Sequence, residues 1–238
     1  MRLTALGVYG PFPRAGSACS GYVVETGETR ILLDCGSGVF SRLSGVCQLD
    51  SIDAVVLSHL HFDHCSDMGV LRYAAEAGWC GEAPLRVIAP ETPAEIRDPL
   101  LDSPAFALEP AEDGKQIRIG DLTVTLHRMR HPVETYGAEI SDTAGKRMFY
   151  TGDTGWFEEL ETLVYGVDFL LADTCFTDVE AQERPDVHMS VKQACKLAKN
   201  ACVRQLGCTH HFGASERLPI PLDFSPAIVV KDMGQYEV

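Results

Sequence analysis

The 238-residue sequence lacks the features that mark membrane and secreted proteins. It contains no apolar run of about 18 residues, so no membrane-spanning helix is expected. Its first residues, Met1 to Gly7, lack the long apolar core of a secretory signal. We therefore expect a cytoplasmic protein with no membrane partner.

The sequence also lacks the cysteine spacings of zinc fingers and disulfide-rich domains. It has nine cysteines, but no C-x-x-C pair occurs, and the odd number argues against a disulfide framework. Most of these residues should be buried thiols that behave as small apolar side chains. Cys65 is the candidate for a reactive group or metal ligand, because it directly follows a histidine cluster.

No cluster of lysine and arginine appears in a chain whose formal net charge is −14. Proteins that bind duplexes or tRNA gain affinity by releasing counterions from phosphates, which requires a basic patch. Structured RNA is therefore less expected as a partner than a small anionic substrate, whose charge bound divalent cations can neutralise. The oligomeric state stays open, with a homodimer as one possibility.

What the sequence does contain is a dense histidine cluster after a short buried strand. The apolar run Ala54–Leu57 predicts the strand, and residues 58–64 (SHLHFDH) follow it. A helix over 66–78, capped by Ser66 or Asp67, is expected next. Three imidazoles and a carboxylate within six residues are the ligand types that zinc and similar divalent metals prefer. The segment therefore predicts a metal site at the end of a strand.

The motif His59-x-His61-x-Asp63-His64 resembles the HxHxDH signature of the metallo-β-lactamase fold hydrolases. Within that superfamily, the chain is most similar to the ribonuclease Z-like phosphodiesterases, including small bacterial ones that act on cyclic nucleotides. The matching landmarks run over nearly the whole chain: Leu32–Gly38, the HxHxDH loop, His131, Thr151–Gly155, His188–Ser190 and Thr209-His210.

The resemblance implies an α/β fold, the αββα four-layer sandwich of two mixed β-sheets flanked by helices. Alternating strands and helices, interrupted by hairpins, agree with it. No proline- or serine-rich linker divides the chain. We therefore expect one domain over 1–238, made of two halves of about 1–130 and 131–238.

The resemblance also implies a site for two divalent metal ions. Zinc is the preferred ion, and manganese or iron would accept the same nitrogen and oxygen ligands. The first ion would be held by His59, His61 and His131. The second would be held by Asp63, His64 and His210, and Asp153 would bridge the two.

Two of these positions have neighbouring alternatives. His127 precedes His131 in the same expected strand, but only His131 has the family's following context, HPxExYG. His211 adjoins His210, and their side chains should point apart. We prefer His210, because it directly follows Thr209, as the ligand does in the family.

His188 distinguishes the ribonuclease Z-like branch, because thioesterases of the glyoxalase II type share the ligands but lack this histidine. Asp173 stands where those relatives place a glutamate that orients it. The aspartate is one methylene shorter, so the hydrogen bond is expected to run through water or to be lost. In the implied mechanism, Asp63 or Asp153 orients the attacking water, and His188 protonates the departing alkoxide.

These features predict a metal-dependent phosphodiesterase for small phosphodiesters such as cyclic nucleotides. Polar groups of the Ser17–Ser20 loop and of Tyr136 are expected at the rim of its site. One alternative is a ribonuclease Z-like endoribonuclease for tRNA 3′ ends, which would need a basic arm not visible between 154 and 187. Another is a thioester or lactam hydrolase, which would not need His188.

Three segments predict little regular structure. Residues 105–114 are mixed in character, and 176–187 are polar and irregular. Residues 212–226 hold three prolines and no helical pattern, so the helix that follows the last ligand in relatives is expected to be missing. The chain should then end with a strand at Ile228–Val230.

Overall fold

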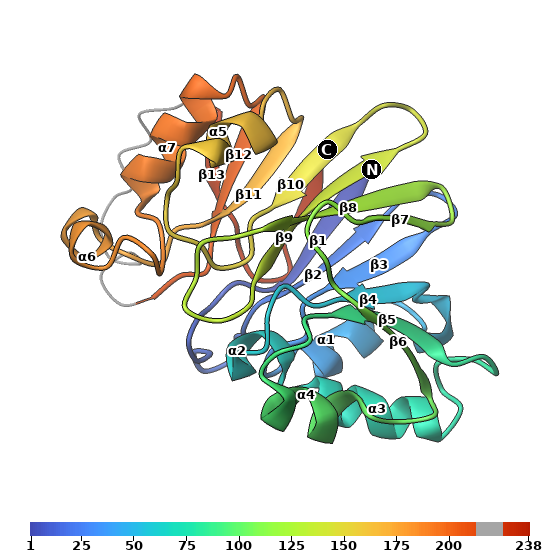
Figure 1. Ribbon diagram of the computed structural model, residues 1–238. Helices are drawn as coiled ribbons and strands as arrows, with labels where there is room; N and C mark the ends of the chain where they lie inside the picture. Colours follow the sequence, from blue (N-terminus) through green and yellow to red (C-terminus); the bar gives the residue numbers. More distant parts are fainter. Residues whose placement is uncertain (213–225) are drawn as a thin grey trace.

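In the computed structural model, which describes residues 1–212 and 226–238, two seven-stranded sheets pack face to face. Helices cover the outer face of each sheet (Figure 1). The α/β four-layer sandwich expected from the sequence is therefore confirmed.

The first sheet comes mostly from the N-terminal part of the chain. Its strands are β1 (Arg2–Gly7), β2 (Gly21–Glu25), β3 (Arg30–Leu33), β4 (Ala54–Val56), β5 (Leu85–Ala89), β6 (Phe106–Pro110) and β14 (Gln235–Glu237), in the order β14-β1-β2-β3-β4-β5-β6. Its helical elements are α1 (Val39–Val46), the 3-10 turn at Leu49–Ser51, α2 (Phe62–Cys65), α3 (Met68–Glu76) and α4 (Ala94–Leu101). Strands β3 to β6 run parallel, so their carboxyl ends share one edge.

The second sheet holds the rest of the strands. They are β7 (Gln116–Ile119), β8 (Leu122–Arg128), β9 (Tyr136–Asp142), β10 (Arg147–Tyr150), β11 (Phe169–Asp173), β12 (Gln205–Thr209) and β13 (Ala227–Val229), in the order β13-β12-β11-β10-β9-β8-β7. Helices α5 (Glu159–Leu163) and α7 (Val191–Asn200) cover its outer face, whereas α6 (Asp178–Glu183) lies apart from both sheets (Figure 1). Strands β10 to β13 are parallel.

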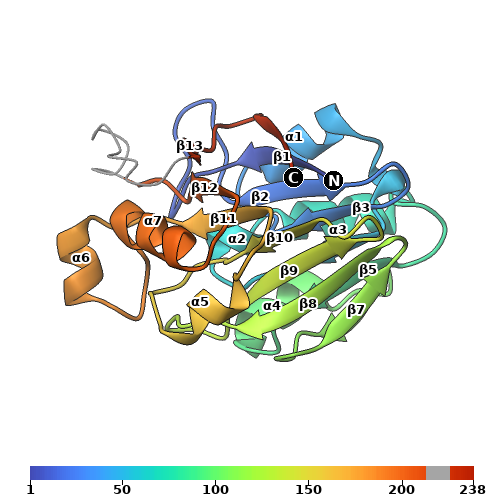
Figure 2. The same cartoon turned by 90° about the horizontal axis from the view of Figure 1, so that it is seen from above.

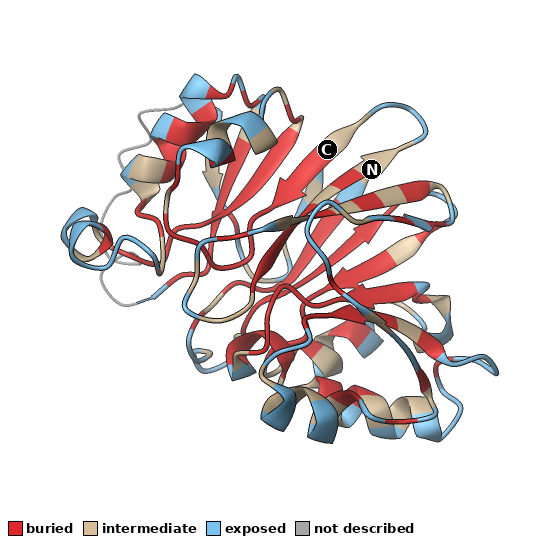
Figure 3. Ribbon diagram, in the orientation of Figure 1, coloured by how far each residue is buried: buried red, intermediate tan, exposed pale blue. Residues whose placement is uncertain are grey.

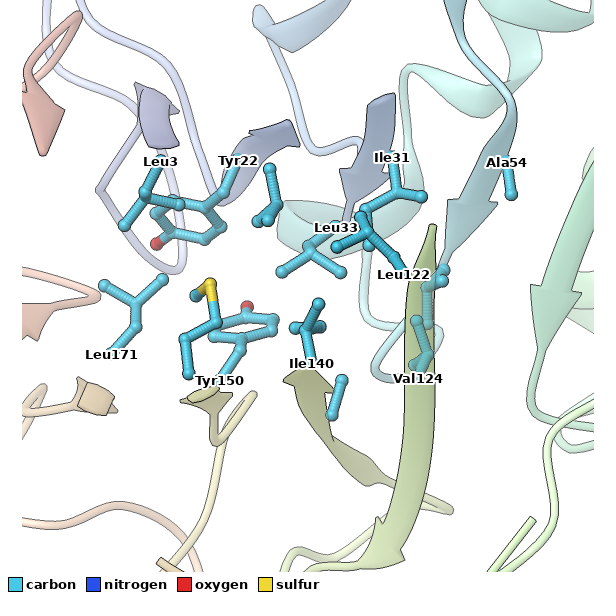
Figure 4. Packing of buried hydrophobic residues seen from close by; sticks show 14 of the residues in the cluster. Leu3, Tyr22, Ile31, Leu33, Ala54, Leu122, Val124, Ile140, Tyr150 and Leu171 are labelled. Carbon is cyan, nitrogen blue, oxygen red and sulfur yellow. The ribbon is translucent and has the colours of Figure 1, made fainter. Parts of the chain in front are cut away.

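The central core lies between the two sheets. Leu3, Tyr22 and Leu33 of the first sheet face Tyr150 and Leu171 of the second (Figure 4). Strand β8 shows the underlying pattern, because its residues alternate between buried and partly exposed, as expected for a strand with one face on the core. Two further apolar clusters lie under the helices, so both faces of the central strands are buried (Figure 3).

Three elements escaped the sequence analysis. Strand β6 forms within residues 105–114, because it pairs in parallel with β5. Helix α6 forms within 176–187, where Thr177 and Glu180 make a capping box. Strand β14 pairs with β1, so the chain does not end with the strand at 227–229, and the two termini lie side by side (Figure 2).

The helix expected over 66–78 begins earlier and is divided into α2 and α3. Asp67 is the N-cap residue of α3, as one of the two expected alternatives, but its side chain makes no capping hydrogen bond, and Ser66 is the C-cap residue of α2. The Asp67 carboxylate instead accepts a hydrogen bond from the backbone N–H of Phe40 at 3.0 Å and so ties α1 to the loop. Ser190 does cap α7, in a capping box with Gln193.

The chain passes from the first sheet to the second between β6 and β7, before the division at about 130 that the sequence indicated. The predicted loss of a helix after His210 concerns residues outside the described ranges. Within those ranges, no helix is long and apolar enough to cross a membrane.

Candidate metal centre

The candidate ligands lie where strands of both sheets end. His59 and His61 follow β4, and Asp153 follows β10. Asp173 is the last residue of β11, and His210 comes directly after β12. Loops beyond the carboxyl ends of parallel strands meet at one edge, which explains how residues far apart in the sequence come together.

Three histidines form the first group of candidate ligands. His59 Nε2 lies 2.9 Å from His61 Nδ1, and His131 Nε2 lies 3.3 Å from the same atom. Two nitrogens bound at about 2.0–2.1 Å to one tetrahedral zinc ion lie roughly 3.3 Å apart, so the spacings fit a single ion. Burial lowers the pKa of all three imidazoles, that of His59 most strongly, which favours the neutral form that binds metals.

Asp63, His64 and His210 form the second group, with ligand atoms within 4.8 Å of one another. His210 Nε2 lies 3.2 Å from both Asp63 Oδ2 and His64 Nε2. Burial acts to lower the pKa of His64 and His210, but carboxylates, Asp153 foremost, hold both values well above the ordinary one. The group therefore concentrates negative charge in a buried place, which a bound cation would neutralise.

Asp153 faces both groups at once. Its Oδ2 lies 3.6 Å from His59 Nε2, and its Oδ1 lies 3.2 Å from His64 Nε2. Oδ1 is buried and has no hydrogen-bond partner among the described residues. A buried carboxylate oxygen without a partner is costly, so this arrangement of seven residues fits divalent cations.

A buried aspartate to which the sequence analysis gave no role supports the second group. Asp34 accepts hydrogen bonds from His64 Nδ1 at 2.7 Å and from the Tyr150 hydroxyl at 2.6 Å. It also accepts from the backbone N–H and the hydroxyl of Ser58, at 2.7 and 2.8 Å. By occupying Nδ1, Asp34 leaves Nε2 of His64 for the ligand cluster. The available signal was a carboxylate placed directly after the buried strand β3.

His188 lies beside both groups and is held by Asp173. Its Nδ1 donates directly to Asp173 Oδ2 over 2.7 Å, so the expectation of a lost or water-mediated bond is wrong. The preceding residue, Val187, accepts a hydrogen bond from His131 Nδ1 at 2.8 Å through its carbonyl. Because Nδ1 of His188 is engaged, Nε2 is the ring nitrogen left to exchange a proton with a substrate.

Comparison with known proteins agrees with this geometry. Residues 29–211 match the β-lactamase superfamily domain. The chain belongs to this superfamily.

Its similarity to other superfamily members extends over most of their length. The probable metallo-hydrolase YhfI of Bacillus subtilis (strain 168) is 32% identical over 226 residues, covering 92% of this chain and 91% of that protein. The crystal structure of YhfI matches with a TM-score of 0.89 at 29% identity, covering 99% of this chain and 98% of that one. A ribonuclease Z of Mycobacterium bovis (strain BCG / Pasteur 1173P2) is 28% identical over 254 residues, covering 90% of this chain and 87% of that protein. A diphosphatase of the PhnP family shares the fold at 17% identity, with a TM-score of 0.78 and coverage of 99% and 97%.

The protein is thus a metallo-hydrolase of the β-lactamase fold, and its ligand cluster opens into a pocket of about 610 Å³. Besides members of the cluster, the described residues that line this pocket include Phe62, Phe176 and Arg184. The prediction that the Ser17–Ser20 loop and Tyr136 contribute to the rim of the site is wrong, because none of the described pocket-lining residues comes from either. The Tyr136 hydroxyl instead donates to Glu134 at 2.9 Å.

The two alternative histidines of this metallo-hydrolase lie outside the cluster. The His127 ring stacks on Phe149 at a centroid distance of 5.6 Å, and His127 Nε2 lies 3.6 Å from Glu139 Oε2. His211 Nε2 donates to the Val230 carbonyl at 3.1 Å, so its side chain points away from the site, as expected from its adjacency to His210.

The cysteine beside the site is not the one that the sequence indicated. Cys65 is buried, and burial raises the pKa of its thiol to about 12, which disfavours the reactive thiolate. Cys65 belongs to none of the candidate metal-ligand groups found among the described residues. Cys175 instead has its sulfur within 4.8 Å of ligand atoms of His188 and His210. The sequence feature that could have indicated Cys175 was its position two residues after Asp173, at the end of a buried strand.

Proposed function

We propose that this metallo-hydrolase is a two-metal phosphodiesterase for small phosphodiesters, with cyclic nucleotides as the leading candidates. The observation that carries the proposal is the position of the His188–Asp173 pair beside Asp153, whose two oxygens face one ligand group each. Zinc is the preferred ion, and manganese or iron would suit the same ligands. Individual residues of the chain would then have separate roles in the reaction.

Two bound ions would neutralise charge on the phosphoryl oxygens and lower the pKa of water toward neutrality. Asp63 and Asp153 are the carboxylates placed to orient the attacking water by accepting its hydrogen bonds. His188 holds a proton at Nε2 for the departing oxygen, and Asp173 stabilises the charged ring through Nδ1. An alkoxide is a poor leaving group, so this proton matters most for alkyl esters.

Pocket size and charge support a small substrate. The volume of about 610 Å³ falls within the range of roughly 300–1,000 Å³ that is usual for small-molecule sites. The net charge of −14 opposes association with a long phosphate backbone. The segment 154–187 contains α5, β11 and α6, which leave little of it for an extended basic arm.

A ribonuclease Z-like endoribonuclease is the second candidate, because a relative at 28% identity bears that name. A thioester or lactam hydrolase of the same fold would use the ligand cluster but would have no need of the His188–Asp173 pair. One activity panel separates the three classes.

The panel contains cyclic mononucleotides, cyclic dinucleotides, bis(p-nitrophenyl) phosphate, a tRNA precursor, a thioester and a β-lactam, each with Zn²⁺ or Mn²⁺ at physiological salt. We expect the highest kcat/KM on a small phosphodiester, and about two equivalents of metal by elemental analysis. Faster cleavage of the tRNA precursor at its 3′ trailer would replace the proposal with the ribonuclease. Less than about half an equivalent after reconstitution would refute the two-metal site.

A further inference from the structure

Among the described residues that line the pocket, one is an arginine. Arg184 directly follows α6, a helix that lies at the edge of the molecule (Figure 1). It lines the same pocket as His188. Its guanidinium carbon lies 4.3 Å from the centroid of the Phe176 ring. That ring in turn meets the His188 ring edge to face, with centroids 4.6 Å apart. One aromatic ring therefore links Arg184 to the histidine proposed as the leaving-group acid.

The charge of Arg184 is not neutralised by an ion pair within the described residues. Two other arginines on this side of the protein do have partners, since Arg128 lies 3.8 Å from Glu134 and Arg130 lies 3.6 Å from Asp186. Glu180, the acid one turn before Arg184, directs its carboxylate to the backbone N–H and hydroxyl of Thr177, at 2.9 and 2.8 Å. In a chain with a net charge of −14, an arginine at the pocket wall that forms no ion pair within the described residues is available to an external anion.

The contact with Phe176 prepares Arg184 for that role. Phe176 is buried, and its backbone N–H donates to the Met189 carbonyl at 3.2 Å, so the ring is a fixed platform beside His188. A guanidinium lying over an aromatic face keeps the N–H donors on its edge available. Those donors form a planar fork that matches phosphate oxygens in a two-point contact.

We propose that Arg184 binds a second phosphate group, on the leaving-group side of the substrate. This deepens the proposed function and rests on it, because the side is defined by His188 as the leaving-group acid. The substrate class is then a small phosphodiester that carries a further phosphate, such as a 5′-phosphorylated dinucleotide. This narrows the cyclic nucleotides of the proposed function to those with a second phosphate, because a cyclic mononucleotide offers no such group to Arg184.

The dinucleotides pApA and ApA test this proposal, because they differ only in the 5′-phosphate. That phosphate belongs to the nucleoside whose 3′-oxygen departs. Both are compared for kcat/KM, and their slowly hydrolysed phosphorothioate analogues are compared for binding by calorimetry to the metal-loaded protein. The variants are Arg184→Gln, Arg184→Lys and Arg97→Gln, the last being a matched control on α4 whose side chain pairs with Asp98.

We expect the 5′-phosphate to improve kcat/KM and binding affinity about tenfold or more in the wild type and in Arg97→Gln. This is the gain typical of one charge-assisted contact. In Arg184→Gln the advantage should fall below about twofold, with partial recovery in Arg184→Lys. A wild-type advantage below about twofold, or an advantage that Arg184→Gln retains, overturns the proposal. Failure of the wild type to hydrolyse any phosphodiester would reject the proposed function instead, and the binding comparison would still decide the role of Arg184.

Discussion

His188 Nδ1 donates a hydrogen bond to the Asp173 carboxylate over 2.7 Å, although the ribonuclease Z-like resemblance implies a longer glutamate there. The shorter side chain suffices because the segment that carries His188 lies against the end of β11. Phe176 donates its N–H to the Met189 carbonyl, and Phe176 and Ser190 form a parallel bridge. The position of the backbone at His188 therefore compensates for the shorter side chain of Asp173.

The first prediction concerns this histidine. We expect His188→Ala to slow hydrolysis of alkyl phosphodiesters by about 10²–10⁴-fold, the usual contribution of general acid catalysis. Hydrolysis of bis(p-nitrophenyl) phosphate should fall much less, because nitrophenolate leaves without a proton. The measurement is kcat on both substrates with one metal-loaded preparation. Equal losses would refute the role of leaving-group acid, and a loss of metal would make His188 a ligand.

The second prediction compares two ligand candidates. Asp153→Ala should reduce activity and metal content more than His131→Ala, because Asp153 faces both ligand groups and His131 only one. His127→Ala is the control, since its ring stacks on Phe149 outside the cluster. Elemental analysis and kcat are measured for all three variants. An Asp153 variant that keeps the wild-type metal content and turnover would contradict the bridging position.

The sequence was informative about the site because each proposed ligand follows a recognisable feature. His59 and His61 come after an apolar strand, and Asp153 and His210 follow β10 and β12 in the same way. Such local patterns, together with the resemblance, were enough to predict the fold and the cluster that the structure brings together. Local patterns also predicted the cap of α7 at Ser190.

What the sequence did not indicate depends on distant partners. Asp34 acquires its role only through Ser58, His64 and Tyr150, which lie 24, 30 and 116 residues away. The polar tripeptide of β14 becomes a strand only by pairing with β1. Arg184 lies in a polar segment with no apolar period, and its position at the pocket arises from packing on Phe176.

The third prediction concerns Asp34. Asp34→Ala removes the acceptor of four hydrogen bonds and leaves buried donors of Ser58, His64 and Tyr150 unpaired. Metal affinity should fall about 10–100-fold, as is usual when the partner of a ligating histidine is lost. Each unpaired buried donor should also lower the free energy of unfolding by about 1–3 kcal/mol.

Metal titration calorimetry and urea unfolding of the metal-free protein measure these two effects. Tyr150→Phe is the control, because it removes one donor and leaves the Asp34–His64 contact in place. If a folded Asp34→Ala protein binds metal as tightly as the wild type, Asp34 does not orient His64.

The last prediction uses the close approach of Gly10 to His210. A Cβ added at Gly10 would lie 1.9 Å from His210 Nε2, far inside any real contact, so one of the two must move. A turn of the His210 ring away from Gly10 would withdraw a ligand atom from Asp63 and His64. Gly10→Ala should therefore lower metal content to about half and reduce kcat by about tenfold or more. The group of Asp63 and His64 loses one ligand nitrogen, whereas His59, His61 and His131 keep their ligand nitrogens.

Gly27→Ala is the matched control for this substitution. Nothing lies within 4 Å of a Cβ at Gly27, so this variant should keep its metal and its turnover. Elemental analysis and kcat decide between the outcomes, with circular dichroism to verify that both variants are folded. Should Gly10→Ala retain the full metal content and activity of Gly27→Ala, His210 would not be needed as a ligand. The second ion would then rest on Asp63, His64 and Asp153 alone.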